Sequence, residues 1–380
     1  MTRNRVPLGN YVTEYSVRNK DNEDIPVYSV TNSQGFCREY FGKEVASKDK
    51  TTYKIVPYGY FAYNPSRINV GSVDWQRCEA QVIVSPLYNV FSVSDELDRQ
   101  FLYYFLKSNI GRQMIRAKAA GSVRDNLKLD MLKEMTIPDS SLDDQRHCVA
   151  TLDNLQYLIE LRKKQLNELD NLVKARFVEM FGIYPANQMG WETGKIRDTV
   201  ADVRYGSSRP SVDGGKYPYL RMNNITYGGE LDLSDVKRID VPENELDKCT
   251  VRRGDVLFNR TNSKELVGKT CVYDRDEMMV LAGFVIRVRV NDRVLPEFLS
   301  AFLNTDFSKK TLSEMCKAAI GQANINAQEM QNIGLYLPPL ELQRQFVQFK
   351  KQIDKSKVVV QKALDEAQTL FDSLMQEYFG

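Results

Sequence analysis

The sequence predicts an α/β plus α protein in which two mixed α/β domains are each followed by a long helix, and the two helices form an antiparallel coiled coil. The 380 residues are enough for two or three domains. The second half of the chain repeats the first, and each copy ends in a long stretch with the apolar spacing of a helix seam. We therefore expect a pseudo-twofold internal repeat.

The repeat is clearest at the end of each half. Residues 142–182 align with 340–380 without a gap, with eleven identities in 41 positions. Shorter matches extend upstream at nearly the same offset, so the repeated unit is a globular domain with its helix. These upstream matches join 26–32 to 218–224, 56–64 to 251–259, 101–108 to 298–305, and 121–138 to 321–338.

The globular parts have the pattern of mixed α/β domains. Short apolar runs with β propensity, at 27–30, 81–84 and 280–290, alternate with turn residues. Each half then has one helix-like stretch, near 96–118 and near 296–318. The predicted boundaries are a first domain at 1–138, a first helical region at 139–182, a second domain at 183–337 and a second helical region at 338–380.

The two long stretches are predicted to be helices that pack on each other. The first runs from Asp143 without proline or internal glycine, and Gly182 is placed to end it. Apolar residues follow the alternating three-and-four spacing of a coiled-coil seam. An alternative is that each helix packs on its own domain. The seam residues are Leu152, Leu155, Ile159, Leu166, Leu169 and Val173 in the first copy, and Ile353, Val360, Leu364, Phe371 and Leu374 in the second.

Composition excludes several classes of protein. Hydrophobic residues make up 42% and charged residues 27%, as in an ordinary soluble protein. The sequence shows no membrane-length apolar run and no signal-peptide pattern, so we expect a cytoplasmic protein. The six cysteines are scattered and there is a single histidine, which argues against disulfide scaffolds and most metal sites. Net charge is +2, and only residues 1–138 are net basic, with 19 basic and 15 acidic side chains.

Motifs of familiar enzymes are missing. The sequence has no phosphate-binding loop of the NTPase type, no dinucleotide-binding glycine motif and no nucleophile elbow. The segment Asn64-Pro65-Ser66-Arg67 lacks the second proline and the aromatic ring of the adenine methyltransferase motif. We therefore expect no catalytic residue and no cofactor in this chain, and favour a binding protein.

Polar loops beside apolar strands are the candidate binding sites. Arginine can bond two acceptors of guanine and asparagine can pair with adenine, whereas serine, threonine and lysine suit phosphates. Each loop alone is also typical of a solvated turn, but the loops recur at equivalent positions of both halves with different side chains. We therefore predict that the two domains bind different DNA sequences. The first-half candidates are Tyr28, Ser29, Asn32, Ser33, Tyr63, Asn64, Ser66, Arg67, Lys118, Ser122 and Arg124. Those of the second half are Arg204, Ser207, Ser208, Arg209, Arg221, Asn223, Asn224, Arg260, Thr261, Asn262, Ser263, Lys264, Gln322, Asn324 and Asn326.

The duplicated domain-plus-helix plan and these loops resemble the specificity (S) subunit of type I restriction–modification systems, over nearly the whole chain. The resemblance implies that 1–138 and 183–337 are target recognition domains for the two parts of a split double-stranded DNA sequence. It implies that the helices act as a spacer and as a docking surface for methyltransferase (M) subunits, expected to number two. S-adenosylmethionine would come with those M subunits, and ATP and Mg with restriction (R) subunits, in a bacterial or archaeal cytoplasm.

Two other functions compete with this interpretation. One is a coiled-coil scaffold with two protein-binding domains and no role in DNA recognition. The other is an enzyme whose active site has an unfamiliar pattern. Sequence-specific DNA binding distinguishes the specificity subunit from the scaffold, and activity of the purified chain with S-adenosylmethionine would indicate the enzyme.

Overall fold

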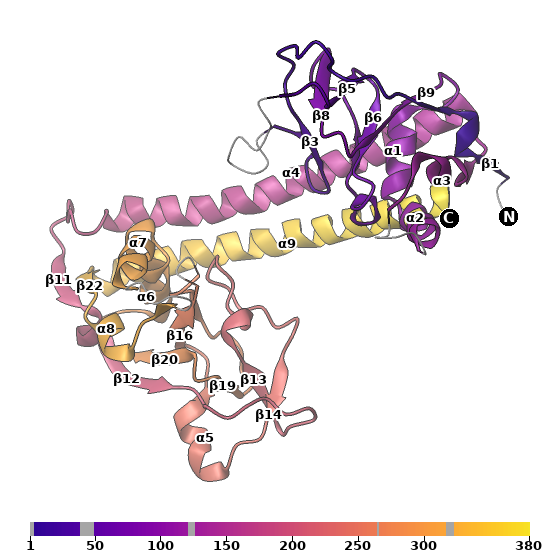
Figure 1. Ribbon diagram of the computed structural model, residues 1–380. Coiled ribbons are helices and arrows are strands. Elements are labelled where there is room, and N and C mark those ends of the chain that lie inside the picture. Colours follow the sequence, from indigo (N-terminus) through magenta and orange to yellow (C-terminus); the bar gives the residue numbers. More distant parts are fainter. Residues whose placement is uncertain (1–3, 39–48, 121–125, 264–265, 317–322) are drawn as a thin grey trace. The chain divides into compact units, whose positions relative to one another are not determined.

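The computed structural model describes residues 4–38, 49–120, 126–263, 266–316 and 323–380. The chain forms two compact units, and the boundary between them crosses both long helices, α4 (Leu142–Phe181) and α9 (Leu340–Phe379) (Figure 1). Unit 1 comprises residues 1–163 and 362–380, and unit 2 comprises residues 164–361. Each unit therefore contains one globular half and a part of each long helix.

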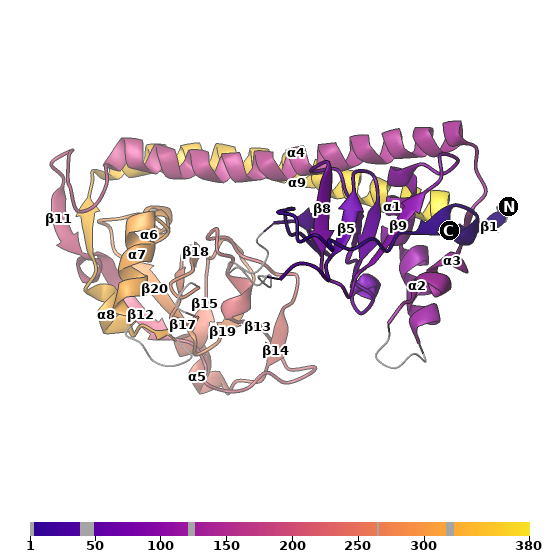
Figure 2. The ribbon, with the colours of Figure 1, turned by 45° about the horizontal axis from the view of Figure 1, so that its top comes forward.

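Unit 1 is built on a four-stranded antiparallel sheet with the order β2-β9-β6-β7. Three two-stranded ladders, β1-β10, β3-β4 and β5-β8, accompany it. Figure 2 shows these strands with helix α1. The strands are β1 (Arg5–Pro7), β2 (Val12–Glu14), β3 (Ser29–Thr31), β4 (Gly35–Cys37), β5 (Lys54–Pro57), β6 (Phe61–Tyr63), β7 (Val73–Trp75), β8 (Gln81–Val84), β9 (Asn89–Val93) and β10 (Thr136–Pro138). The helices are α1 (Arg99–Lys107), α2 (Asn109–Ala119) and α3 (Leu129–Lys133), with short 3-10 turns η1 (Leu8–Asn10) and η2 (Ile68–Val70).

Unit 2 contains two four-stranded sheets, β12-β20-β16-β18 and β14-β13-β19-β15, and the ladders β11-β22 and β17-β21. Its strands are β11 (Glu192–Lys195), β12 (Val200–Tyr205), β13 (Tyr217–Leu220), β14 (Lys237–Ile239), β15 (Thr250–Val251), β16 (Val256–Asn259), β17 (Thr261–Asn262), β18 (Thr270–Val272), β19 (Met279–Leu281), β20 (Val285–Val290), β21 (Ala323–Asn324) and β22 (Gly334–Leu337). The helices are α5 (Glu243–Cys249), α6 (Pro296–Leu303), α7 (Asp306–Met315) and α8 (Ala327–Gln331), with 3-10 turns η3 (Ile196–Thr199) and η4 (Met222–Asn224).

The two globular halves share one topology. The sheet β12-β20-β16-β18 has the strand order of β2-β9-β6-β7, and β11-β22 corresponds to β1-β10. The parallel pairing of β13 with β19 corresponds to a parallel bridge between Val27 and Ile83 in unit 1. The predicted fold of two mixed α/β domains built as an internal repeat is therefore confirmed.

Each predicted helix-like stretch is divided into two helices. Ser108 and Thr305, at equivalent positions, have extended backbone, and their hydroxyls cap the start of α2 and of α7. The turn between α1 and α2 is tight, because a Cβ on Gly111 would lie 2.0 Å from the carbonyl oxygen of Phe105. Helices therefore occupy most of both predicted stretches, and the break within each, where a side-chain cap starts the second helix, was not predicted.

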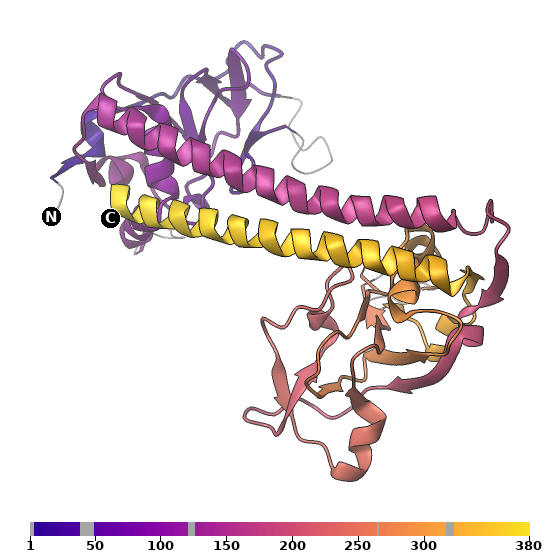
Figure 3. The same cartoon turned by 180° about the vertical axis from the view of Figure 1, so that it is seen from behind.

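The ends of the long helices close the cores of the globular halves. In unit 1, the end of α9 lies beside the globular half (Figure 3). Phe379 at this end is fully buried, with its ring centroid 5.0 Å from that of Phe101. In unit 2, the equivalent Phe181 at the end of α4 lies 5.0 Å from Phe298, the equivalent of Phe101. Each core is thus completed by the helix of the other repeat.

The beginnings of the same helices pack on their own domains. Cys148 and Leu152 of α4 belong to the core of unit 1, and Phe346 of α9 belongs to the core of unit 2. Within unit 2, contacts of α4 with α9 join Phe177 to Phe346 and Asp170 to Lys357. Residue numbers therefore fall along α4 as they rise along α9, so the paired segments are antiparallel. Both packing alternatives raised by the sequence apply, each to a different part of the helix.

Two identical glutamines attach each helix to the loop before α1 or α6. The Gln145 amide accepts a hydrogen bond from the Asp98 N–H and donates to two backbone carbonyls. Gln343 does the same, accepting from the Leu295 N–H and donating to two carbonyls. Both side chains are buried, so these bonds satisfy amide groups that are removed from water.

The predicted seam residues lie on the less exposed side of the helices. In unit 1, Leu152, Leu155 and Ile159 are buried. None of the other predicted seam residues is exposed, whereas most of their neighbours along α4 and α9 are. The remaining seam residues, all half-buried, are Leu166, Leu169, Val173, Ile353, Val360, Leu364, Phe371 and Leu374.

Candidate nucleic-acid interface

The second-half loop after β16 is joined to the segment that precedes α8. Thr261 and Asn262 form strand β17, which pairs antiparallel with Ala323 and Asn324 of β21. The Thr261 hydroxyl donates to Asn324 Oδ1 at 3.1 Å. The structure therefore brings Arg260, Thr261 and Asn262 together with Asn324, which lies 63 residues after Thr261 in the chain.

Arg260 is held by an aromatic ring. Its guanidinium carbon lies 4.9 Å from the ring centroid of Tyr205, the last residue of β12. The Tyr205 hydroxyl in turn accepts a hydrogen bond from the Ala327 N–H at 2.9 Å. Stacking restricts the guanidinium while its N–H groups can still donate in the plane, which suits bidentate contact with guanine.

An exposed phenylalanine lies beside this arginine. Phe284, in the turn before β20, is 53% exposed, and its carbonyl accepts the backbone N–H of Arg260 at 3.0 Å. The same turn is bonded to Ser207, whose carbonyl accepts the Gly283 N–H. Arg260, Tyr205 and Phe284 form what we term the Arg260 cluster, which joins an arginine fork to exposed aromatic surface. Tyr205 and Phe284 were not predicted, and only their position beside Arg260 reveals them.

Other second-half candidates serve the domain itself. Arg209 forms two hydrogen bonds with Glu245, and Arg221 pairs with Asp235 at 2.8 Å. Asn224 is 2% exposed, and its amide donates to the carbonyls of Asp232 and Asp235. These side chains are engaged within the protein. Arg204 pairs with Asp202, Asn326 caps α8, Ser207 is buried, Ser263 is half-buried, and Ser208 and Asn223 are exposed.

The first-half candidates are divided between core and surface. Tyr63 has no exposed surface, and its hydroxyl donates to the carbonyl of Leu127, so its ring belongs to the core. Asn64 Oδ1 accepts from the backbone and hydroxyl of Ser66, which forms the turn that presents the exposed Arg67. Lys118 forms an ion pair with Glu134. Tyr28 and Ser29 are half-buried, and Asn32 and Ser33 are exposed in the β3–β4 turn.

Four candidates lie outside the described residues: Ser122, Arg124, Lys264 and Gln322.

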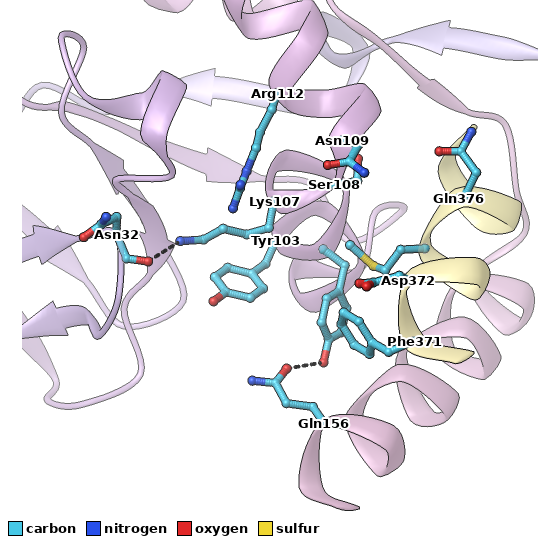
Figure 4. Close-up of a pocket in the computed structure, with 12 residues that line it drawn as sticks. Asn32, Tyr103, Lys107, Ser108, Asn109, Arg112, Gln156, Phe371, Asp372 and Gln376 are labelled. Carbon is cyan, nitrogen blue, oxygen red and sulfur yellow. Dashed lines mark hydrogen bonds between the residues drawn. The ribbon is translucent and has the colours of Figure 1, made fainter. Parts of the chain in front are cut away.

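A cavity of about 300 Å³ lies in unit 1, between α1, α2 and the long helices (Figure 4). Lys107 and Arg112 line it on the side of the globular half, and Phe371 and Asp372 line it on the side of α9. Burial lowers the pKa of Lys107 to about 8, the charge of Arg112 lowers it as well, and that of Asp74 raises it. Neither cation was predicted, because both occur in a helical stretch without a loop motif.

Metal and membrane sites have no support in the described part of the chain. No group of three or more His, Cys, Asp or Glu side chains there is placed to hold a metal ion. Within the same residues, no helix is both long enough and apolar enough to cross a membrane.

Comparison with known proteins identifies the family. The sequence model of the family described as "Type I restriction modification DNA specificity domain" matches this chain twice, over residues 9–171 and 189–367. The specificity subunit of the type I restriction enzyme EcoKI of Escherichia coli K12 is 23% identical over 292 residues, which cover 73% of this chain and 63% of that subunit. The StySPI specificity subunit of Salmonella potsdam is 22% identical, with the same coverage. The chain therefore spans less than two thirds of the length of these relatives.

Solved structures share the fold. A type I restriction–modification S subunit from M. genitalium superposes with a TM-score of 0.53 at 15% identity, covering 100% of this chain and 97% of that one. A chain from a structural study of assembly and conformational transition in a type I R-M system gives a TM-score of 0.59 at 19% identity, with 99% and 97% covered. Since the family match extends over both repeats, the chain belongs to the type I restriction–modification DNA specificity family and contains two copies of its domain.

Proposed function

We propose that this chain is a non-catalytic specificity subunit that recognises a split double-stranded DNA sequence and directs methyltransferase and restriction subunits to it. The observation that carries the proposal is one fold made twice, with different side chains at the equivalent loop. Arg260 follows β16, whereas proline, Pro65, stands at its position after β6. Two similar surfaces with different donors suit two different half-sites.

Recognition in the second half-site centres on the Arg260 cluster. The arginine would contact a guanine, Asn262 and Asn324 would supply further donors and acceptors, and Phe284 would contact a base edge or methyl group. In the first half-site, the exposed Arg67 in the turn after β6 is the corresponding candidate. The paired arginines, Arg209 and Arg221, would support these loops without contacting bases.

Partner subunits would dock on the exposed sides of the long helices. Tyr157, Leu158 and Leu161 of α4 are 65%, 41% and 39% exposed, although they are large and apolar. On α9, Val358 and Val359 are 70% and 69% exposed. Such apolar surface on a solvated helix favours burial against another protein. We assign it to methyltransferase subunits, which would supply S-adenosylmethionine, while restriction subunits would supply ATP and Mg chemistry in the cytoplasm.

The primary test is a genome-wide map of methylated adenine in the host, with and without this gene. We expect a two-part motif that disappears on deletion and returns when the gene is restored. Restoration with Arg260→Ala should return a motif altered in one part only. A methylation pattern that is unaffected by the deletion, although an active methyltransferase copurifies with the chain, would contradict the proposed function.

The helices would also set the length of the unread gap. Each has 40 residues, which corresponds to about 60 Å at about 1.5 Å per residue. A heptad inserted at matched positions of both helices keeps the seam and adds about 10.5 Å, close to three base pairs. We expect a longer gap between unchanged half-sites in the methylation map. An unchanged gap would refute the spacer role and leave the recognition role intact.

A further inference from the structure

The cavity of unit 1 is lined by two cations that form no ion pair with a described carboxylate, although Asp372 also lines it. Lys107 is the last residue of α1, and Arg112 lies in the first turns of α2 (Figure 4). Lys107 Nζ donates to the backbone carbonyls of Gly71 and Asn32. Asp74 forms its ion pair with Arg77, and no described carboxylate forms an ion pair with Lys107 or Arg112.

This arrangement costs energy unless an anion is bound. Burial lowers the pKa of Lys107 to about 8, against the charge of Asp74, which raises it, and together with the charge of Arg112, which lowers it, so the protein stabilises the charged amine less well than water does. Arg112 Nε is buried and has no hydrogen-bond partner among the described residues. An acceptor that enters the cavity would pair with this donor.

The equivalent turn of unit 2 collects positive charge with different residues. Lys309 stands at the position of Arg112, and its Nζ donates at 2.8 Å to the carbonyl of Gly268, the equivalent of Gly71. Burial, and then the charges of Lys174 and Lys269, lower its pKa to about 8. Lys269 Nζ donates to the Met222 carbonyl rather than to an acid.

Stabilisation of the turn does not by itself explain why Lys107 and Lys309 are charged. A neutral amide can bond a carbonyl at this place, as Asn304, the equivalent of Lys107, does with Thr270 at 2.8 Å. Both repeats nevertheless keep lysine at the glycine carbonyl and a second cation beside it. Both units therefore keep positive charge at this turn, although the lysines stand at different positions of the repeat. This indicates an anionic ligand.

We propose that the cavity beside Lys107 and Arg112 binds a phosphate group, and that this phosphate belongs to the DNA backbone. The proposal rests on the proposed function, to which it adds an interaction that is independent of base sequence. Phosphate oxygens accept from both lysine and arginine, and Arg112 Nε and its terminal N–H groups are suitable donors.

The test compares the salt dependence of DNA binding by the full chain. Anisotropy titrations would use a duplex with the mapped motif and a scrambled duplex, at several KCl concentrations between about 50 and 200 mM. The double variant Lys107→Gln/Arg112→Gln should lower the slope of log K against log salt by about 0.9 for each phosphate that the protein no longer neutralises. Its preference for the motif should stay unchanged, because a phosphate carries no sequence information.

Matched variants separate the site from net charge and from folding. Arg146→Gln/Lys362→Gln removes the same charge from unit 1, at helix positions that are exposed and paired with Asp143 and Glu366. We expect this control to change the slope by clearly less. Lys107→Arg keeps the charge and should retain most of the slope, and thermal melting of each variant reports whether it is folded.

The source of the phosphate is identified by acetylating the protein at pH 8 and measuring the modification of Lys107 by mass spectrometry. DNA should protect Lys107 several-fold, whereas inorganic phosphate at the same phosphate concentration should protect it less. Stronger protection by inorganic phosphate would overturn the assignment to the DNA backbone. The site would be overturned if the wild-type protein binds the duplex and the folded double variant has the same slope of log K against log salt. Absence of any wild-type binding to the mapped motif would instead contradict the proposed function.

Discussion

Units 1 and 2 close their cores in the same way but join the helix pair through different polar contacts. Phe379 and Phe181 occupy equivalent positions and pack on equivalent phenylalanines. In unit 1, the Tyr104 hydroxyl of α1 then bonds Asp153 of α4 at 2.5 Å. In unit 2, Lys357 of α9 pairs with Asp170 of α4 and with Glu230 of the globular half.

The same seam position thus carries opposite chemistry in the two units. Ile159 is buried on α4 in unit 1, and its equivalent on α9 in unit 2 is Lys357. The backbone plan is the same in both cases. Contacts that complete a core are therefore preserved between the repeats, whereas a position in the helix seam can be filled by an apolar side chain or by an ion network. A polar residue in a seam also favours one register over others.

The largest effect is expected from the helix ends. Phe181→Ala and Phe379→Ala should each lower the free energy of unfolding by about 3–5 kcal/mol, because a fully buried ring is removed from a core. Hydrogen exchange should locate the damage in the opposite repeat: Phe181→Ala should loosen α6 and Phe379→Ala should loosen α1. The exposed Val358→Ala is the control. Increased hydrogen exchange in α1 after Phe181→Ala would contradict the conclusion that each helix end completes the core of the other repeat.

The two buried glutamines should behave alike. Gln145→Leu and Gln343→Leu each remove three hydrogen bonds and leave three backbone groups without their side-chain partner, so we expect each to cost about 2–3 kcal/mol of stability. Chemical denaturation measures both, and Gln352→Leu, at an exposed position of α9, is a matched control. A neutral effect in one unit alone would show that water replaces the side chain there.

The recognition loops should behave differently from each other. Arg260→Ala should reduce discrimination at one base of one half-site by about 1–3 kcal/mol, as a bidentate guanine contact requires. Tyr205→Leu should remove part of this discrimination, because the guanidinium is no longer held in place. Binding to duplexes altered at single positions measures both effects. Arg253→Ala, at an exposed arginine that pairs with Asp276, is the control. A change in the other half-site would contradict independent recognition.

The smallest effect is expected at Lys357. Burial lowers its pKa, but the hydrogen bonds and charges of Asp170 and Glu230 outweigh burial and raise it above the ordinary value of 10.5. The pairing therefore stabilises the fold fully below about pH 10.5, and this contribution is lost as the pH rises further. Lys357→Met should cost about 1 kcal/mol or less, because both acids are partly solvated. Chemical denaturation of the wild type and of Lys357→Met, at pH 8 and above pH 10.5, measures this contribution. A difference in the free energy of unfolding that grows with pH would contradict the stabilising role of the ion pairs.

The duplication, the long helices and their apolar seam follow from the sequence alone. Apolar residues such as Leu152, Leu155 and Ile159 follow one another at helical spacing, which is a local property of the chain. The sequence also showed that polar residues 260–262 follow an apolar strand, but the predicted loop is in part the short strand β17. The family could be inferred from the same features, since the order of domains and helices is written along the chain.

Which polar residues are available for binding depends on contacts that the sequence does not show. Arg209 and Arg221 look like Arg260 in the sequence, but Glu245 and Asp235 pair with the first two, while Tyr205 stacks on the third. The structure likewise placed Lys107 and Arg112 beside one cavity. The physical reason is that ion pairs, stacking and burial depend on residues brought together by the fold from distant parts of the chain.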